Sequence, residues 1–552
     1  MKIVTTLLLA TPLFLAAPAA SSAHAAAELV FTQDSVDALI AKGRALLAHG
    51  KAAEAQAIFE QATAKDGSSL RTRTWILRSW MDQGRINDAL GEIDKLAKDN
   101  SGRAEIDYLY GMAFFISAKD RIAQGAGGSI VAMNYGDTSR YLQAALKADP
   151  QTYTDAYATL AEAAWNTQEF AVARSAAEKA CALEPNDIET AWLLAQIAFS
   201  QYQQALADDT HKAEADGHAK AVADACNKAD QVCAKSTKEE DKLFRGKLHA
   251  RLGELAEWKQ DKAGAAKEYG LALGFDPASA DLAGLFGRIG GESFLAAIEE
   301  GCAQFTKNWG EANKGDATLL WWLGYARLDQ KQYEKSEQAF AAAMKKWPQY
   351  YNAWFYTAMA RYARQDYDGA LAAITRHYDA NRDDLVATFL QNRDYNLRVF
   401  DFLIGRSATK RDLDAAMLSE VQALAVGDNW NYWNNAGLFY RDAGTPLQRS
   451  ENEEDRKLAA GDFEKSYGCY QSALALEPNN PALLNDTAVM LHYYLDRDLE
   501  KAKEMYRKAT ERAQIELARK DLKPDLKELY TTALRDSKNN LAKLEKGDKR
   551  PN

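Results

Sequence analysis

Two consecutive stretches of the chain carry the same residue pattern, displaced by 34 residues. The first stretch has Gly324, Tyr333 and Phe340, and the second has Ala358, Tyr367 and Ile374 at the same steps. Small residues let two helix backbones approach each other, and bulky residues fill the spaces between neighbouring helices. Pro348, at the end of the first stretch, cannot continue a helical hydrogen-bond ladder. The spacing therefore predicts pairs of short antiparallel helices.

Related patterns recur on both sides of these two stretches. They begin near Gly43, Gly84, Gly111, Tyr157, Trp192, Gly253, Gly437 and Leu484. Each helix pair leaves an apolar face that only the next pair can cover, so an array is needed for stability. The chain has 552 residues but only 11 Pro and 33 Gly, which leaves room for many helices. We therefore expect an all-α fold of stacked helix pairs.

This pattern resembles the tetratricopeptide repeat (TPR) family, whose unit is a 34-residue helix-turn-helix pair. The resemblance is carried by residues 320–348, LWWLGYARLDQKQYEKSEQAFAAAMKKWP, and by the next unit, in which Trp354 stands four residues before Ala358. It implies a TPR-type right-handed helical solenoid, that is, a superhelix of antiparallel helix pairs, with helical and loop insertions.

Several segments interrupt the repeat and suggest a division of the chain. We expect an N-terminal array over 26–380, a degenerate helical connector over 381–425, C-terminal repeat units over 426–512, and a capping helix and tail over 513–552. Insertions are expected at 116–137, 201–245 and 445–461. Three glycines at 125, 127 and 128 indicate a loop in the first insertion, and the polar second insertion indicates an extended helix.

The N-terminus has the features of an export signal. Lys2 is followed by an apolar run over residues 3–17, and Ala23-His24-Ala25 fits an A-x-A cleavage site. The alternative is a membrane-spanning helix, but the run falls short of the roughly 20 residues that a bilayer requires. We therefore expect a signal peptide over 1–25, cleavage near Ala25, and a periplasmic or secreted protein with no membrane span.

Charge and motifs exclude several classes of function. The net charge of -10 argues against nucleic-acid binding, which usually needs a concentrated basic face. Signatures of zinc hydrolases, serine hydrolases and nucleotide-binding loops are absent. There is no C-x-x-C pair, and the five cysteines are an odd number whose pairing stays open. We expect no cofactor, no metal site and no catalytic residues.

The TPR resemblance implies that the first helix of each unit lines a concave groove. At the matching positions stand the candidate ligand-binding residues Trp321, Tyr325, Phe355, Met359, Tyr362, Asn431, Asn434, Asn435, Arg441, Asn485 and His492. Aromatic rings offer flat contact area, and Asn can pair with both the donor and the acceptor of a peptide backbone. The alternative is that the aromatic side chains pack between helices.

These features predict an exported, non-catalytic scaffold that binds a protein or peptide partner along its groove. Two alternatives remain open. An envelope glycan-binding module would use the same aromatic rings to stack on sugars. A secreted carbohydrate-active enzyme of the α/α-toroid type would need two carboxylates roughly 5 to 10 Å apart in a deep cleft.

Overall fold

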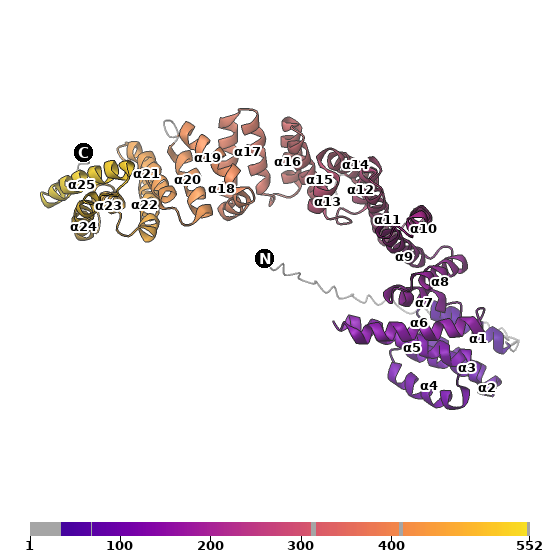
Figure 1. Ribbon diagram of the computed structural model, residues 1–552. Coiled ribbons are helices and arrows are strands. Elements are labelled where there is room, and N and C mark those ends of the chain that lie inside the picture. The colour runs from indigo at the N-terminus through magenta and orange to yellow at the C-terminus, as the bar shows by residue number, and fades with distance from the viewer. Residues whose placement is uncertain (1–34, 68, 311–315, 408–411, 549–552) are drawn as a thin grey trace, which may run out of the picture. The chain divides into compact units, whose positions relative to one another are not determined.

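The computed structural model describes residues 35–548 apart from 68, 311–315 and 408–411 (Figure 1). Within these residues the chain forms 25 α-helices and no β-strand. Successive helices are joined mostly by short turns and pack as antiparallel pairs. The predicted all-α fold of helix pairs is therefore confirmed. The expected signal peptide over 1–25 lies outside the described residues.

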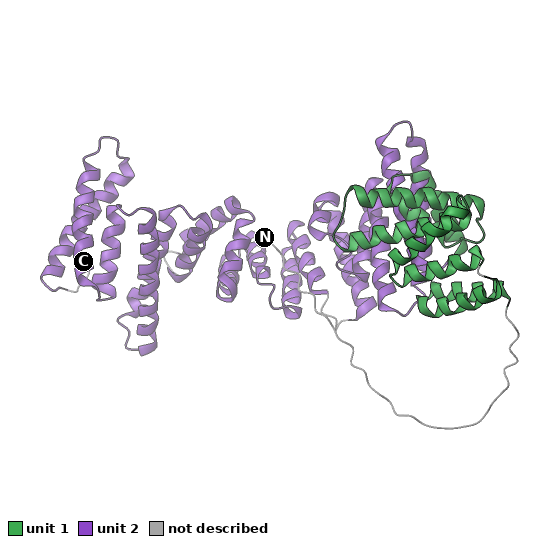
Figure 2. Cartoon of the chain, turned by 90° about the horizontal axis from the view of Figure 1, so that it is seen from below, with its two compact units in different colours: residues 1–185 green, residues 186–552 purple. Residues whose placement is uncertain are grey.

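The chain divides into two compact units, residues 1–185 and 186–552 (Figure 2). The helices of the first unit are α1 (Val36–Ala48), α2 (Ala52–Lys65), α3 (Leu70–Asp82), α4 (Ile86–Asn100), α5 (Ala104–Ala123), α6 (Ser129–Ala148), α7 (Ala156–Asn166) and α8 (Phe170–Leu183).

The second unit begins with α9 (Ile188–Ala207), a short 3-10 helix (Lys212–Glu214), α10 (Ala215–Cys233), α11 (Glu239–Trp258), α12 (Lys262–Phe275), α13 (Leu282–Ile289) and α14 (Gly291–Trp309). Its middle contains α15 (Ala317–Asp329), α16 (Tyr333–Lys346), α17 (Asn352–Ala363), α18 (Tyr367–Leu390), α19 (Arg393–Ser407) and α20 (Asp412–Val426). It ends with α21 (Trp430–Leu447), α22 (Glu453–Leu476), α23 (Pro481–Val489), a π-helical turn (Met490–Tyr494), α24 (Leu499–Leu517) and α25 (Pro524–Glu545).

In several helix pairs, a glycine of the first helix packs against an aromatic ring of the second helix, 16 residues later in the sequence. This relationship holds for Gly43 and Phe59, for Gly253 and Tyr269, and for Gly324 and Phe340. A Cβ atom on Gly324 would lie 2.7 Å from the ring of Phe340, which is fully buried. The glycine is therefore needed for close packing, as the repeat pattern predicts.

The turns that join the two helices of a pair have the same backbone geometry in several pairs. Gly50 and Gly84, 34 residues apart, have φ angles of 70° and 79°. Lys331 and Gln365 occupy the same kind of turn with φ angles of 58° and 65°. A left-handed residue ends the first helix and redirects the chain into the second. The 34-residue period is thus visible in the backbone as well as in the sequence.

Two of the expected insertions mainly lengthen the helices on either side of them. Glycines at 125, 127 and 128 indicate a loop within the insertion over 116–137, and α5 and α6 run through most of this segment and leave only residues 124–128 between them. The three glycines do lie in this short loop, where Gly125 and Gly128 turn the chain at positive φ. In the same way, residues 445–461 mainly extend α21 and α22.

The boundary between the compact units falls after Pro185 and not within the expected connector over 381–425. That connector contains the end of α18, all of α19 and most of α20. Its buried side chains, among them Phe389, Phe400 and Val421, share one hydrophobic cluster with Phe355 and Ile374 of the preceding repeat. The expected insertion over 201–245 contains the end of α9, the 3-10 helix, α10 and the start of α11.

Three further properties follow from the described part of the chain. No helix there is long and apolar enough to cross a membrane. No group of three or more His, Cys, Asp or Glu side chains there could hold a metal ion. Four of the five cysteines are buried and Cys302 is half-buried.

Candidate functional site

A pocket of about 540 Å³ opens among helices α15 to α19. Its wall combines the first helices of two successive repeats with the following helices, which lack a clean repeat. The lining residues are Tyr325, Leu328, Asp329, Lys331, Tyr333, Phe355, Tyr356, Met359, Ala363, Thr388, Gln391, Asn392, Tyr395 and Asn396. Such a mixture of aromatic, aliphatic and amide groups suits an uncharged, partly apolar ligand.

A rigid aromatic framework forms one side of the pocket. Trp321 stacks on Tyr325 with ring centroids 5.8 Å apart, and Tyr325 meets Tyr356 edge to face at 5.4 Å. The indole Nε1 of Trp321 donates a hydrogen bond of 2.9 Å to Oδ1 of Asn352. These contacts connect α15 with α17, so the rings that face the pocket are held in place before any ligand arrives.

The polar groups of the pocket balance in charge. Asp329 and Lys331 are its only charged lining residues, one of each sign. The hydroxyl of Tyr356 donates to Oε1 of Gln391 at 2.8 Å, which joins α17 to the turn after α18. The side-chain amide of Asn392 has no hydrogen-bond partner among the described residues. It is available to a ligand that carries both a donor and an acceptor.

Both central tyrosines stay protonated near neutral pH. Burial, together with the nearby Asp329 carboxylate, raises the pKa of Tyr325. Burial, together with Tyr325 and Asp384, raises the pKa of Tyr356 to about 12. The phenol groups of Tyr325 and Tyr356 are therefore neutral hydrogen-bond donors.

Three of the candidate groove residues line this pocket, namely Tyr325, Phe355 and Met359. Trp321 supports the wall from behind through Tyr325. Tyr362 lies outside the pocket, where its ring packs edge to face against Tyr367 and Phe402. The repeat register therefore gathers part of the candidate set in one place.

The α21 candidates lie apart from the pocket. Asn431 and Asn435 are exposed, and Asn434 is half-buried. The backbone N–H of Asn431 donates to the side chain of Asn429, which caps the start of α21. Arg441 is half-buried and forms an ion pair of 2.8 Å with its neighbour Asp442. The structure does not bring these residues together with those of α15 and α17.

The expectation that Asn485 and His492 face an open groove was wrong. Their exposed fractions are 6% and 1%. Asn540 of α25 donates to Asn485, and a ring nitrogen of His492 pairs with the backbone oxygen of Asp548 at 3.0 Å. The last helix and the residues after it cover this face, and burial lowers the pKa of His492.

Several pocket residues were missed by the sequence analysis. Thr388, Gln391, Asn392, Tyr395 and Asn396 all belong to the segment that was interpreted as a degenerate connector. No repeat register assigns a face to them, because α18 is kinked at Asn381, where the backbone leaves helical geometry. The only available signal was the polar and aromatic composition of the segment.

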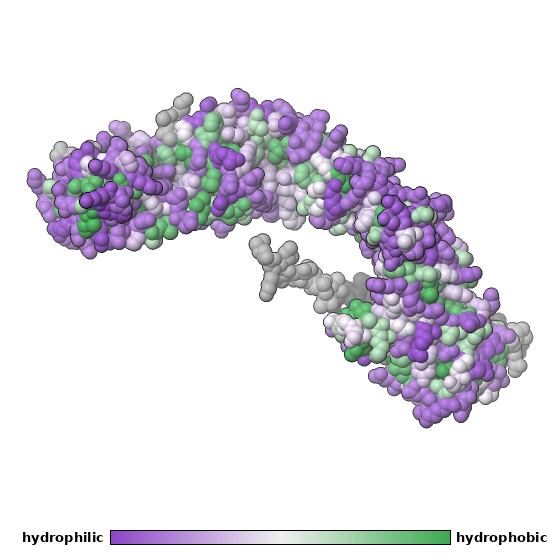
Figure 3. Space-filling model, viewed as in Figure 1, coloured by the Kyte–Doolittle hydropathy of each residue, from purple (hydrophilic) through white to green (hydrophobic). Residues whose placement is uncertain are grey.

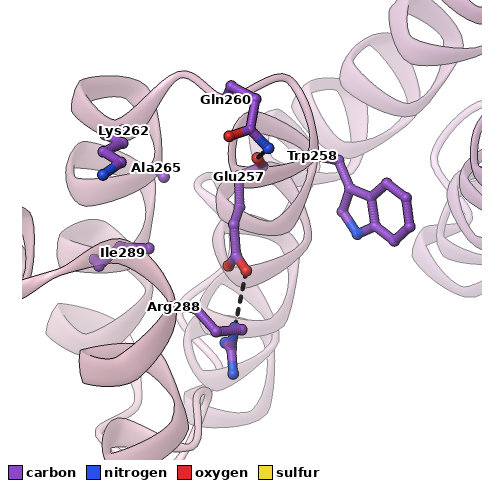
Figure 4. A pocket seen from close by; sticks show the side chains of 7 residues that line it. All are labelled: Glu257, Trp258, Gln260, Lys262, Ala265, Arg288 and Ile289. Atoms are coloured by element: carbon purple, nitrogen blue, oxygen red, sulfur yellow. Dashed lines mark hydrogen bonds and ion pairs between the residues drawn. The ribbon is translucent and has the colours of Figure 1, made fainter.

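A second pocket of about 380 Å³ lies among α11, α12 and α13 (Figure 4). The carboxylate of Glu257 accepts from Arg288 at 2.9 Å and from the hydroxyl of Tyr269 at 3.0 Å. The indole of Trp258 points away from this pair, and Lys262 lies across the pocket. Because Arg288 and Tyr269 already donate to the Glu257 carboxylate, this pocket is a weaker candidate for ligand binding than the pocket among α15 to α19.

Two buried ionisable clusters hold helices together. In the first, Oε2 of Glu420 accepts hydroxyl groups from Tyr378 and Tyr440, each at 2.7 Å, and Oε1 accepts from Arg382 at 3.1 Å. This cluster joins α18, α20 and α21. Both oxygens of the Glu420 carboxylate have a donor, which favours a structural role.

In the second cluster, the ring of His249 on α11 lies between two carboxylates. Its Nδ1 is 2.8 Å from Glu268 on α12, and its Nε2 is 3.5 Å from Asp230 on α10. Arg245 forms a second ion pair with Asp230. Burial alone lowers the pKa of His249, but the hydrogen bonds to the two carboxylates outweigh it, and the pKa is raised overall.

Sequence models of the tetratricopeptide repeat match three segments of the chain, residues 46–112, 154–187 and 311–384. The last segment includes the part of the pocket that α15, α16 and α17 contribute. No curated protein sequence matches the chain.

The solved structures that match the chain share little sequence with it. The TPR domain of P58(IPK) has 14% identity and a TM-score of 0.19, covering 80% of this chain and 99% of that one. The Cut9–Hcn1 complex has 13% identity and a TM-score of 0.25, with 90% and 96% covered. The Naa15/Naa10 complex bound to HypK has 11% identity and a TM-score of 0.24, with 91% and 99% covered.

Proposed function

Because the chain is a tetratricopeptide-repeat protein with multiple repeats, we propose that it is a non-catalytic scaffold whose pocket among α15 to α19 binds a peptide segment of a partner protein. The repeat fold is consistent with protein–protein interaction. The observation that carries the proposal is the preformed wall of Trp321, Tyr325 and Tyr356 beside an unpaired amide at Asn392.

The chemistry of the pocket favours an extended peptide over a charged metabolite. One acidic and one basic residue leave it without net charge. Phe355, Met359 and Leu328 supply an apolar floor for a large side chain, and the amides can pair with a peptide backbone. Rigid aromatic anchors of this kind contribute much of the affinity in peptide recognition.

The same geometry supports binding over catalysis. Asp329 is the only carboxylate among the lining residues, whereas glycoside hydrolysis usually needs two acids flanking the bond. A glycan-binding module remains an outcome of the test. Export is also part of the proposal, supported by the apolar run and the A-x-A motif in residues 1–25. Cell fractionation with mass spectrometry of the mature N-terminus tests it.

The binding test compares two tryptophan substitutions of exposed alanines. Ala363 lines the pocket, and Ala341 lies on the exposed side of α16. Peptides are first selected from a random 12-residue library on the full chain, and their affinities are then measured by fluorescence anisotropy. Ala363→Trp should fill the pocket and weaken binding at least about tenfold, since the anchor side chain loses its site. Ala341→Trp should bind as the unmodified chain does.

Three results would contradict the proposal. The library could yield no peptide that binds in the micromolar range, the two variants could bind equally well, or hydrolysis of an oligosaccharide could be measured at this site. Retention on a glycan array that is lost in Ala363→Trp, without any peptide binding, would favour the glycan-binding alternative instead.

A further inference from the structure

The α5–α6 hairpin of the first unit ends in a tip without charge. From Ile122 to Gly136 no residue is charged, and the interval is bounded by Arg121 and Asp137. Every residue over 119–130 is exposed. Figure 3 shows hydrophobic and neutral residues gathered at the end of the α5–α6 pair. The residues that are both uncharged and exposed are therefore 122–130 with Ala132 and Met133, an unusual run in a chain that is 26% charged.

Three large apolar side chains stand on this tip. The exposed fractions are 48% for Ile122, 49% for Ile130 and 59% for Met133. The residues between Ile122 and Ile130 are Ala, Gly, Ser and a single Gln. Exposed apolar residues that gather in one place mark surfaces that contact another molecule or a membrane.

The tip cannot bury these side chains within its own unit. Below it, Ala118, Val131 and Tyr135 already pack with Ala163 of α7 in a closed hydrophobic cluster. The turn is also internally bonded, because Gly125 N–H donates to Ile122 O and Ala126 N–H donates to Arg121 O. Together with the bond from Gln124 N–H to Asp120 O, these contacts pair three of the last four carbonyl groups of α5.

We propose that the tip of the α5–α6 hairpin inserts into the interfacial layer of a lipid bilayer and holds the protein there peripherally. A hairpin tip is convex, so it suits entry into a soft apolar layer. The interval over 122–136 offers no charge to pair with the polar rim that surrounds most protein interfaces. The nearest charges, on residues 119–121 of α5 and on Asp137 of α6, lie on the shaft below the tip, at the level of the headgroups.

The charges near the hairpin tip predict how insertion depends on the charge of the lipid headgroups. Lys119 is paired with Glu162 at 2.7 Å, and Arg121 is offset by its exposed neighbour Asp120. The whole chain has a net charge of -10. Insertion is therefore driven by apolar burial alone, and anionic lipid should not strengthen it.

The test uses a reporter at the tip, because the apolar run over residues 3–17 could itself tether the full chain to lipid. An NBD fluorophore is attached to Ile130→Cys and, as a control, to Ile515→Cys, which is 48% exposed on α24. The native thiols are buried or half-buried, and labelling of the unsubstituted chain gives their background. Circular dichroism confirms that each labelled chain is folded.

With phosphatidylcholine vesicles, the label at position 130 should shift to shorter wavelength and resist iodide quenching. The label at position 515 should do neither. Adding Ile122→Ser and Met133→Ser to the Ile130→Cys chain should lower the vesicle partition seen by the label at least about tenfold. The pair Leu458→Ser and Leu390→Ser, exposed residues away from the tip, should leave the vesicle partition unchanged. Phosphatidylglycerol should not increase the response.

Any of four results would overturn the proposal. The label at position 130 could ignore vesicles, or both labels could respond alike. The serine substitutions at the tip could leave the response unchanged. Shielding of position 130 without lipid, rising with protein concentration, would assign the tip to contact between two copies of the chain.

Discussion

Trp321 and Asn352 connect two successive repeats through one hydrogen bond. The indole Nε1 of Trp321 on α15 donates to Oδ1 of Asn352, the first residue of α17, at 2.9 Å. The same indole stacks on Tyr325, which lines the proposed binding pocket. Packing between repeats and the shape of the pocket therefore depend on the same side chain.

Trp321→Phe keeps an aromatic ring and removes the donor. The side chain of Asn352 then loses its hydrogen-bond donor. The free energy of unfolding, measured in urea, should fall by about 0.5–1.5 kcal/mol. Peptide affinity should fall as well, because the stacking surface behind Tyr325 becomes smaller. Trp347→Phe is the control, since Trp347 is exposed. Equal stability and affinity for the two variants would contradict this role of Trp321.

Gly324→Ala should destabilise the repeat in which it lies. The new Cβ atom would lie 2.7 Å from the buried ring of Phe340. Overpacking of this kind costs about 1–3 kcal/mol. Gly468→Ala on α22 is the matched control, because nothing lies within 4 Å of its Cβ position. It should stabilise by about 0.5–1 kcal/mol through helix propensity. Thermal and urea unfolding of both variants measures the difference, and a shift of the same sign in both would be inconsistent with close packing at Gly324.

His249 should make the second unit more stable at mildly acidic pH. Its pKa is raised in the folded state, so the protonated ring contributes stability that is present below its unfolded pKa of about 6.5. This contribution is lost as the pH rises through the folded pKa. The difference in unfolding free energy between the unsubstituted chain and His249→Gln should therefore shrink from about pH 6 to about pH 9.

The control for this pH dependence is His211→Gln. His211 is exposed and lies 3.5 Å from Glu214, an arrangement in which solvent screens the interaction. The unfolding free energy of His211→Gln should differ little from that of the unsubstituted chain at every pH. If the His249→Gln difference grew with pH, the ring would not be held in its protonated form between Asp230 and Glu268.

Glu420→Gln should lower stability more than an exposed glutamate would. The amide keeps a single oxygen, so either Arg382 or the two hydroxyls of Tyr378 and Tyr440 would face an N–H group. Leaving a buried donor unmatched costs about 1–3 kcal/mol. Glu453→Gln removes only a surface ion pair with Lys457 and should change stability little. If the two substitutions lowered the free energy of unfolding in urea equally, the Glu420 cluster would not stabilise the packing of α18, α20 and α21.

The repeat register explains which parts of the fold could be predicted. It marked Gly324 as a position of close helix approach and predicted that Tyr325, Phe355 and Met359 face the same side, because a 34-residue period repeats each position on the same helix face. Contacts outside the period could not be predicted. Asn540 and Asp548 cover Asn485 and His492 through contacts that occur once in the chain.

The pocket wall formed by residues after α18 could not be predicted either, for the same reason. Asn392 and Tyr395 come after the kink at Asn381, so their direction depends on how α18 and α19 pack and not on any local pattern. The α5–α6 hairpin shows a related limit, since the glycines at 125 and 128 mark a turn but do not tell how far the helices on either side extend.

The most direct test of the account is hydrogen–deuterium exchange on the full chain with and without a peptide selected from the random library. Binding at the proposed pocket should slow exchange in α15, in α17, and in the segment from Thr388 to Asn396. The Ala363→Trp chain should show no such protection at the same peptide concentration. Protection confined to α21–α25 or to the first unit, or none at all, would contradict the claim that this pocket is where the protein binds its partner.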